Sequence, residues 1–145
     1  MILGKLETVT PVRRGKLAVE FDDGRRATLD LMPLIRKRSN LSPLSNSEVF
    51  QRVKVSEDGW SVEWPDVGID FGVNQLRRWA DEQSGRTMSA DRFREWMQRN
   101  KLTLDSAGEA LGLSRRIIAY YLSGEQPIPR TVMLATEGFE ARKVA

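Results

Sequence analysis

Arg115 and Arg116 are the residues whose type and position point most directly to a chemical role. They follow Ser114 immediately, at the start of a segment whose apolar residues recur with helical spacing. An arginine guanidinium can donate two parallel hydrogen bonds to O6 and N7 of guanine. Two arginines at the entering end of a helix therefore suit a pair of base-reading side chains, although two adjacent arginines on their own are usually just solvated surface.

Composition argues against an enzyme. The 145 residues include no His and no Cys, which removes imidazole bases, thiolate nucleophiles and Cys-ligated metal sites. The candidate acidic residues Asp22, Asp23, Asp66 and Asp70 lie in or beside turn sequences, where aspartate has a conformational role. We expect no catalytic residue, no metal and no cofactor.

The overall composition is that of an ordinary globular protein, with 40% hydrophobic and 30% charged residues. The net formal charge is +3, from 23 basic and 20 acidic residues, which is compatible with a nucleic-acid partner but does not require one. Apolar runs are too short for a membrane span, and the first residues lack a signal-peptide pattern. We expect a cytoplasmic protein without membrane association.

The first half of the chain alternates with a period of two, which predicts antiparallel strands. A first strand is expected from about Lys5 to Thr10. A hairpin follows around Asp22-Asp23-Gly24, with alternating apolar residues on both sides: Leu17, Val19 and Phe21 before the turn, and Ala27, Leu29 and Leu31 after it.

A short helical turn over Leu34–Lys37 and a loop over Ser39–Ser47 are expected next. A second hairpin is predicted around Glu57-Asp58-Gly59, from Phe50, Val53 and Val55 to Trp60, Val62 and Trp64. Asn74 is expected to cap a helix reaching about Gln83. Two basic runs, Arg13-Arg14-Gly15-Lys16 and Arg36-Lys37-Arg38, are read as solvated loop charges that could also contact a DNA backbone.

After Ser84-Gly85-Arg86-Thr87 the spacing is helical throughout. We therefore predict two domains of an α+β protein. Residues 1–84 would form an antiparallel β-sheet domain with a helix, and residues 88–145 an all-α domain.

Four helices are expected in the second domain, each with a recognisable start. Ser89, Thr103 and Ser114 are the predicted N-caps of the first three, and Pro129 lies in the first turn of the fourth, which carries Val132, Leu134 and Ala135. Asn100, Gly112 and Gly124 are the predicted stops.

The helix from Ser114 to Ser123 has two distinct faces. Ile117, Ile118, Tyr121 and Leu122 form the inner stripe, which turns Arg116, Ala119, Tyr120 and Ser123 outward and leaves Arg115 on the shoulder. Amides at the helix starts near Thr103 and Ser114 could hold phosphates, and Arg99, Lys101 and Arg130 are candidate contacts to the DNA backbone.

This segment resembles the lambda-repressor/Cro-type (XRE) helix-turn-helix family. The resemblance covers about fifty residues and is carried by the pattern Leu104-x-x-Ala107-Gly108-x-x-Leu111-Gly112-Leu113-Ser114-x-x-x-Ile118-x-x-Tyr121-x-x-Gly124. It implies a lambda-repressor-like fold whose base-reading positions fall on Arg115, Arg116, Ala119 and Tyr120, with Ser123 beyond. Two positions depart from the family, which usually has Ala at Gly108 and often Gln at Leu104.

Residues 5–82 resemble a small bacterial domain-of-unknown-function family. The resemblance is carried by Phe21-Asp22-Asp23-Gly24, Asp30-Leu31-x-Pro33-Leu34, Phe50-x-x-Val53-x-Val55, Trp64-Pro65, Gly68-x-Asp70 and Leu76. It implies fusion to XRE-type domains and a place beside toxin-like genes.

These observations predict a sequence-specific double-stranded DNA-binding protein, a bacterial transcription regulator. We expect a homodimer, because one small module gives a small interface and two half-sites give specificity. The N-terminal domain is the expected dimerising or partner-binding part, since the tail after Ala135 looks short. The alternative is an antitoxin whose N-terminal domain neutralises a toxin-like protein partner.

Overall fold

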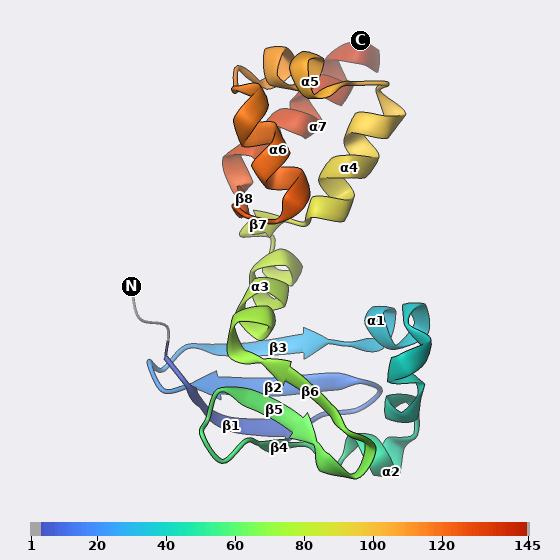
Figure 1. Cartoon of the computed structure of the whole chain (residues 1–145), viewed down its shortest axis with the longest axis vertical. Helices are drawn as coiled ribbons and strands as arrows, with labels where there is room; N and C mark the ends of the chain where they lie inside the picture. The colour runs from blue at the N-terminus through green and yellow to red at the C-terminus, as the bar shows by residue number, and fades with distance from the viewer. Residues whose placement is uncertain (1–3, 145) are drawn as a thin grey trace. The chain divides into compact units, whose positions relative to one another are not determined.

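The computed structural model describes residues 4–144 and has antiparallel sheets and helices, as expected for the α+β class. The chain forms two compact units, one ending at Ala80 and the other beginning at Asp81 (Figure 1). This boundary falls inside one helix, a few residues before the glycine-containing segment at which the sequence suggested a division.

The first sheet of the N-terminal unit has the antiparallel order β1-β2-β3. Its strands are β1 (Leu6–Pro11), β2 (Lys16–Phe21) and β3 (Arg26–Asp30). The predicted hairpin is confirmed, with Gly24 at φ 87° in the turn, a conformation that glycine adopts without strain. Leu17 and Leu29 are paired across it and are fully buried, so they fix which face of the sheet lies on the core.

The second sheet has the antiparallel order β4-β5-β6. Its strands are β4 (Lys54–Val55), β5 (Ser61–Trp64) and β6 (Ile69–Gly72). The predicted second hairpin is present but shorter, because Phe50 belongs to a helix whose N-cap, Asn46, accepts hydrogen bonds from two amides. Strand β6 was not predicted; it forms because Gly68, at φ 67°, reverses the chain after Pro65.

Five helical segments complete this unit: α1 (Met32–Lys37), η1 (Ser39–Ser45), α2 (Ser47–Phe50), η2 (Pro65–Val67) and α3 (Val73–Ser84). The region expected to be a loop from Ser39 is therefore mostly 3-10 helix. Asn74 is not the cap of α3, because the helix begins at Val73, whose amide donates to the Trp60 carbonyl at 2.8 Å. The chain thus passes from β6 into α3 without a separate capping residue.

The core of the N-terminal unit contains one buried arginine. Arg77 is 6% exposed, and its guanidinium lies over the Phe21 ring with Cζ 3.9 Å from the centroid. Its Nη2 donates to Asp23 Oδ2 at 3.0 Å and to the Gly4 carbonyl at 3.2 Å. The hydrogen bonds and the ring compensate part of the loss of water around the charge, while Arg77 Nε is buried without a hydrogen-bond partner. Asp23 therefore has a structural role in holding α3 to the first hairpin.

The C-terminal unit is built from four α-helices and a short ladder. Its elements are β7 (Thr87–Met88), α4 (Ala90–Arg99), α5 (Leu104–Leu111), α6 (Arg115–Ser123), β8 (Ile128–Pro129) and α7 (Arg130–Val144). The expectation of an all-α domain is therefore wrong in one respect, because β7 pairs with β8. Met88 and Ile128 are both buried, and burying them side by side brings the extended segments before α4 and α7 into register. Pro129 precedes α7 and does not lie in its first turn.

Helix α7 is longer than the sequence indicated and runs to Val144. Phe139 packs edge-on against Trp96, with centroids 5.6 Å apart, and Glu140 accepts hydrogen bonds from Arg99 at 2.6 and 3.2 Å. These contacts hold the second half of α7 on α4, so the premise of a short tail after Ala135 does not hold.

The left-handed residue that ends α4 is not the one expected from the sequence. Asn100 has φ −100°, and the left-handed residue is Lys101 at φ 54°. The Asn100 side chain donates to the Trp96 carbonyl at 2.8 Å, which satisfies an acceptor at the helix end and lets the next residue make the turn.

None of the described helices is long and apolar enough to cross a membrane. Within residues 4–144 no group of three or more His, Cys, Asp or Glu side chains could hold a metal ion. Of the candidate acidic residues, Asp23 binds Arg77, and Asp66 pairs with Arg52 at 3.1 Å. The structure therefore gives these two carboxylates structural partners.

Cutting the chain after Ser84 should leave two fragments, 1–84 and 85–145, that each unfold cooperatively. We expect this because the buried apolar residues form two separate clusters, one on each side of the cut. Thermal melts followed by circular dichroism would check it. A gradual, non-cooperative melt of residues 85–145, with 1–84 folded, would show that the helices depend on the sheets.

Candidate nucleic-acid interface

The N-terminus of α5 is closed by a reciprocal cap. Thr103 Oγ1 accepts a hydrogen bond from the Ser106 amide at 3.1 Å, and Ser106 Oγ accepts one from the Thr103 amide at 2.8 Å. The predicted cap at Thr103 is thus present. Ser106 completes it, because its hydroxyl accepts the hydrogen bond from the N-cap amide that a glutamate usually accepts at that position. The start of α5 is held rigidly.

The connection between α5 and α6 depends on a close backbone approach at Gly108. The Leu113 amide donates to the Gly108 carbonyl at 2.8 Å. A Cβ placed on Gly108 would lie 2.5 Å from the Leu113 carbonyl oxygen, a distance that carbon does not tolerate. The helix-turn-helix pattern that the sequence resembles usually has alanine at this position. The close contact with the Leu113 carbonyl gives a geometric reason for glycine here.

Gly112 and Ser114 set the direction in which α6 leaves the turn. Gly112 is left-handed, at φ 70°, and ends α5. Ser114 is the N-cap of α6, and its Oγ accepts a hydrogen bond from the Ile117 amide at 3.2 Å. Both roles are confirmed as the sequence predicted them.

The inner face of α6 is anchored in the core of the C-terminal unit. Ile118 is fully buried, Tyr121 is 6% exposed, and the Tyr121 ring meets Phe93 edge-on at 5.6 Å. Burial raises the pKa of the Tyr121 phenol above its ordinary value, so this side chain stays neutral at physiological pH. These anchors fix the rotation of α6 about its axis.

The two arginines at the start of α6 are exposed and have different partners. Arg115 Nη1 lies 3.1 Å from Asp105 Oδ2 on α5. Arg116 Nε donates to Tyr120 Oη at 2.7 Å, and its Cζ is 5.3 Å from the Tyr120 ring centroid. Arg115 is thus paired with a carboxylate, whereas Arg116 is paired with a neutral phenol and keeps its full positive charge on the surface.

The remaining predicted reading positions lie further along α6. Ala119 and Tyr120 are half-buried, and Ser123 is exposed. The Ser123 hydroxyl donates to the Tyr120 carbonyl at 3.2 Å and accepts from the Glu125 amide at 3.3 Å. Because it takes part in the turn that Gly124 closes at φ 82°, Ser123 is less available to a base than Arg116.

The candidate backbone contacts separate into two kinds. Arg130, at the start of α7, and Lys101 are exposed and form no ion pair with the part of the chain that the structure describes. Arg99 instead binds Glu140, and this hydrogen bond lowers the pKa of the Glu140 carboxyl. Arg99 therefore stabilises α7 on α4.

Two residues that contact α6, Asp105 and Arg94, were not predicted from the sequence. Asp105 places a carboxylate next to Arg115. Arg94 donates from Nη2 to the Leu122 carbonyl at 3.0 Å, near the end of α6, and pairs with Asp91 through Nη1. The spacing of Arg94 and Asp91, three residues apart on one helix, signals their pairing, but no local signal indicates the contact to Leu122.

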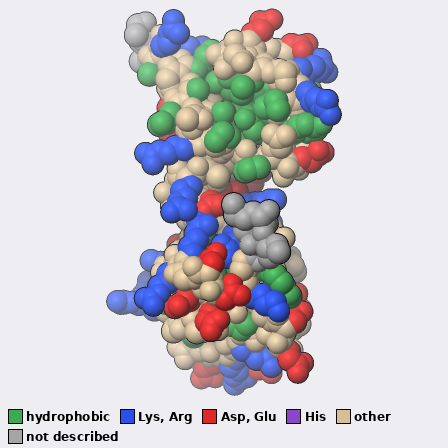
Figure 2. Space-filling view, turned by 90° about the vertical axis from the view of Figure 1, so that its left-hand side faces the viewer, with side chains coloured by type: hydrophobic (Ala, Val, Ile, Leu, Met, Phe, Trp, Pro, Cys, Tyr) green, Lys and Arg blue, Asp and Glu red, His purple; other side chains and the backbone are tan. Residues whose placement is uncertain are grey.

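Apolar side chains also reach the surface of the C-terminal unit. Figure 2 shows hydrophobic side chains gathered on one face of this unit, with basic and acidic side chains around them. A shallow hollow between α5 and α7 is lined by Ala110, Ala135, Gly138 and Phe139, together with the basic residues Arg142 and Lys143. Leu134, expected in the core, is 49% exposed.

Comparison with known proteins gives a family match and a similar solved structure. A family model described as protein of unknown function (DUF2442) matches residues 6–82. A crystal structure from Nitrosomonas europaea ATCC 19718, described as that of a "putative DNA binding protein", is 38% identical in sequence; the match covers 97% of this chain and 88% of the other, with a TM-score of 0.54. No curated protein matches the chain significantly.

Gly108→Ala should destabilise the C-terminal unit by about 1–3 kcal/mol, because the added methyl group overpacks a backbone contact that cannot retreat. Thermal or urea unfolding of the full chain would measure it. The matched control is Gly138→Ala in α7, where an added Cβ meets no described atom within 4 Å. That change should stabilise by roughly 0.5–1 kcal/mol through helix propensity alone. Stabilisation by both substitutions would refute the close approach at Gly108.

Proposed function

We propose that this chain, which belongs to the DUF2442 family of proteins of unknown function, is a sequence-specific DNA-binding protein that reads the major groove with α6. In this proposal α5 and α6 form a helix-turn-helix of the lambda-repressor/Cro type, and the chain acts as a bacterial transcription regulator. No catalytic step is assigned to any residue.

The observation that carries the proposal is the orientation of α6. Ile118 and Tyr121 hold one face of the helix in the core, while Arg115 and Arg116 are exposed at its N-terminal end. In a helix-turn-helix the residues near the start of the second helix contact base edges. The short Gly112–Ser114 connection, with its glycine and its cap, is the connection that this arrangement requires.

Arg116 is the favoured base reader of the two arginines. Its partner, Tyr120, is neutral and orients the guanidinium without cancelling its charge. Arg115 would first have to leave Asp105. Arg116 can therefore present its paired N–H donors to guanine O6 and N7 at a smaller cost in free energy.

Other parts of the surface support contacts to the DNA backbone. The caps take the amides of Thr103, Ser106 and Ile117. The other amides in the first turns of α5 and α6 have no acceptor within their own helices, so these helix starts are suited to bind phosphate oxygens. Arg130 is exposed at the start of α7. The Nitrosomonas europaea structure, described as that of a "putative DNA binding protein", points to the same class of partner.

We further propose that the chain acts as a homodimer on two half-sites. A single helix-turn-helix gives limited specificity, and a two-fold pair reads sites about 34 Å apart. The exposed Leu134 on α7 supports a contact in the C-terminal unit, because a second copy that covered this side chain would gain the free energy of apolar burial.

Arg116→Ala should weaken binding to a selected duplex by about 1–3 kcal/mol per half-site and relax preference at one base pair. Arg130→Ala should weaken binding to selected and scrambled duplexes alike and reduce the slope of binding against salt concentration by about one.

Asp105→Asn should strengthen binding to both duplexes, because it removes a negative charge beside Arg115. Fluorescence-anisotropy titrations at two salt concentrations, with a duplex selected from random DNA, would measure these effects.

Arg78→Ala, which removes an exposed arginine from the N-terminal unit, is the matched control and should leave sequence preference unchanged. If Arg115→Ala and Arg116→Ala both bind selected and scrambled DNA as the unchanged chain does, α6 is not a reader. The helix pair would then be a protein-contact module, as an antitoxin-like role would require.

Full-length protein should sediment as a dimer at roughly 50 μM, and Leu134→Glu should shift it to monomer by burying a charge in the contact. Trp60→Glu, which changes a 40% exposed aromatic residue in the N-terminal unit, should remain dimeric. A dimer of fragment 1–84, or no effect of Leu134→Glu, would instead assign the contact to the N-terminal unit.

A further inference from the structure

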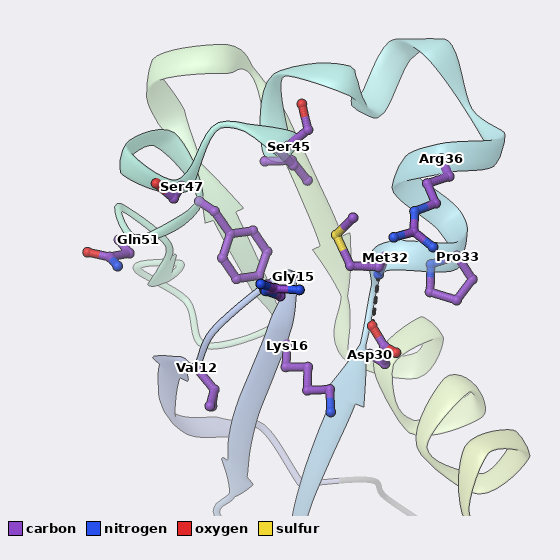
Figure 3. A pocket seen from close by; sticks show the side chains of 13 residues that line it. Val12, Gly15, Lys16, Asp30, Met32, Pro33, Arg36, Ser45, Ser47 and Gln51 are labelled. Carbon is purple, nitrogen blue, oxygen red and sulfur yellow. Dashed lines mark hydrogen bonds between the residues drawn. The ribbon is translucent and has the colours of Figure 1, made fainter.

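A pocket of about 570 Å³ lies at one end of the first sheet of the N-terminal unit (Figure 3). Its walls come from the turn between β1 and β2, the end of β3, helix α1, segment η1 and helix α2. The volume is within the range of pockets that hold small molecules. None of the DNA-binding features proposed above lies on these elements.

The shape of the pocket depends on the turn at Gly15. Gly15 has φ 77°, and a Cβ there would lie 2.6 Å from Met32 Sδ. The Gly15 carbonyl accepts a hydrogen bond from the Leu31 amide at 2.8 Å. These contacts hold the start of α1 against the turn and direct the Met32 side chain toward the pocket, as Figure 3 shows.

Two basic runs that are distant in sequence meet at this pocket. Arg14 and Lys16 come from the turn before β2 and from its first residue, and Arg36 comes from α1. Within residues 4–144 none of the three forms an ion pair. The pairing of β2 with β3 explains the convergence, because Lys16 lies opposite Asp30 and α1 begins two residues later.

The lining contains one carboxylate, Asp30, and its Oδ1 accepts a hydrogen bond from the Met32 amide at 3.0 Å. Three cations against one anion leave the pocket positive. Like charges gathered around a cavity favour an anionic occupant, and arginine is well suited to a carboxylate because its donors match both oxygens.

The floor of the pocket is apolar. Phe50 and Leu44 are buried side chains that reach the lining, and Met32 is half-buried beside them. Phe50 is 3% and Leu44 is 2% exposed, so an occupant gains little by covering them. Met32, Val12 and Pro33 supply the apolar lining that is open to water, which an inorganic ion would leave wet and an organic body would cover with a gain in free energy. The lining thus combines cations at the rim with apolar side chains below.

We propose that this pocket binds a small organic carboxylate that has an apolar body. The carboxylate lies among Arg14, Lys16 and Arg36, and the body packs on Met32 and Val12. Ser45, Ser47 and Gln51 add polar groups at the edge. The proposal does not depend on DNA binding, since it concerns other residues and another ligand.

Isothermal titration of the full chain would test it with three probes. 1-Naphthoate has both the charge and the body, 1-naphthalenemethanol has the body alone, and acetate has the charge alone. We expect 1-naphthoate to bind at least about tenfold more tightly than either of the others, a difference of about 1.4 kcal/mol. Equal binding of the alcohol would overturn the anionic class, and equal binding of acetate would overturn the role of the apolar floor.

Substitutions would locate the binding. Arg36→Glu and, more conservatively, Gln51→Glu should each weaken 1-naphthoate by about tenfold or more, because each places a carboxylate in the lining. Arg38→Glu makes the same charge change as Arg36→Glu at an exposed residue outside the lining and should leave affinity within about twofold. Thermal melts would confirm that all three variants fold. Unchanged affinity in both lining variants, or equal losses in Arg36→Glu and Arg38→Glu, would overturn the assignment.

Discussion

The backbone contact between Gly108 and Leu113 is the constraint on which the arrangement of the C-terminal unit depends. One hydrogen bond and one carbonyl packed where a methyl group would otherwise lie bring the end of α5 against the start of α6. Once that approach is fixed, Gly112 and Ser114 leave α6 a single direction. Ile118 then enters the core, and Arg116 on the opposite face is directed to solvent. The proposed reading surface therefore follows from a glycine that touches no ligand.

The arginines of this chain differ in the partners of their guanidinium groups, a difference that the sequence alone does not reveal. Arg77 is buried on Phe21 and bound to Asp23, Arg99 holds Glu140 on α7, and Arg115 is paired with Asp105. Arg116 has a neutral hydroxyl as partner. An arginine whose charge is already compensated gains less from a phosphate or a base than one whose charge is not. In the proposed DNA complex Arg116 would therefore be favoured over Arg115, by a small margin because the Arg115–Asp105 pair is exposed to solvent.

Features fixed by adjacent residues could be predicted from the sequence, and features fixed by distant contacts could not. The left-handed turns at Gly24, Gly112 and Gly124 are predicted by the residue type alone. The position of Ser114 before a helical segment likewise predicts an N-cap. The β7–β8 ladder has no local signal, because it depends on Met88 and Ile128 being buried together from segments about forty residues apart. The length of α7 likewise depends on Trp96 and Arg99 of another helix.

The role of the basic runs at residues 13–16 and 36–38 could not be predicted from the sequence either, because it depends on contacts between distant parts of the chain. As sequence they are two short groups of solvated charge, equally suited to a DNA backbone or to no partner. The β2–β3 pairing brings part of each run to one cavity, beside Met32 and Val12. A DNA phosphate would satisfy the cations but leave these two apolar side chains exposed to water, which has a cost in free energy. A ligand with both a charge and an apolar body satisfies both parts of the lining, so the arrangement favours a small organic anion over the DNA backbone at this place.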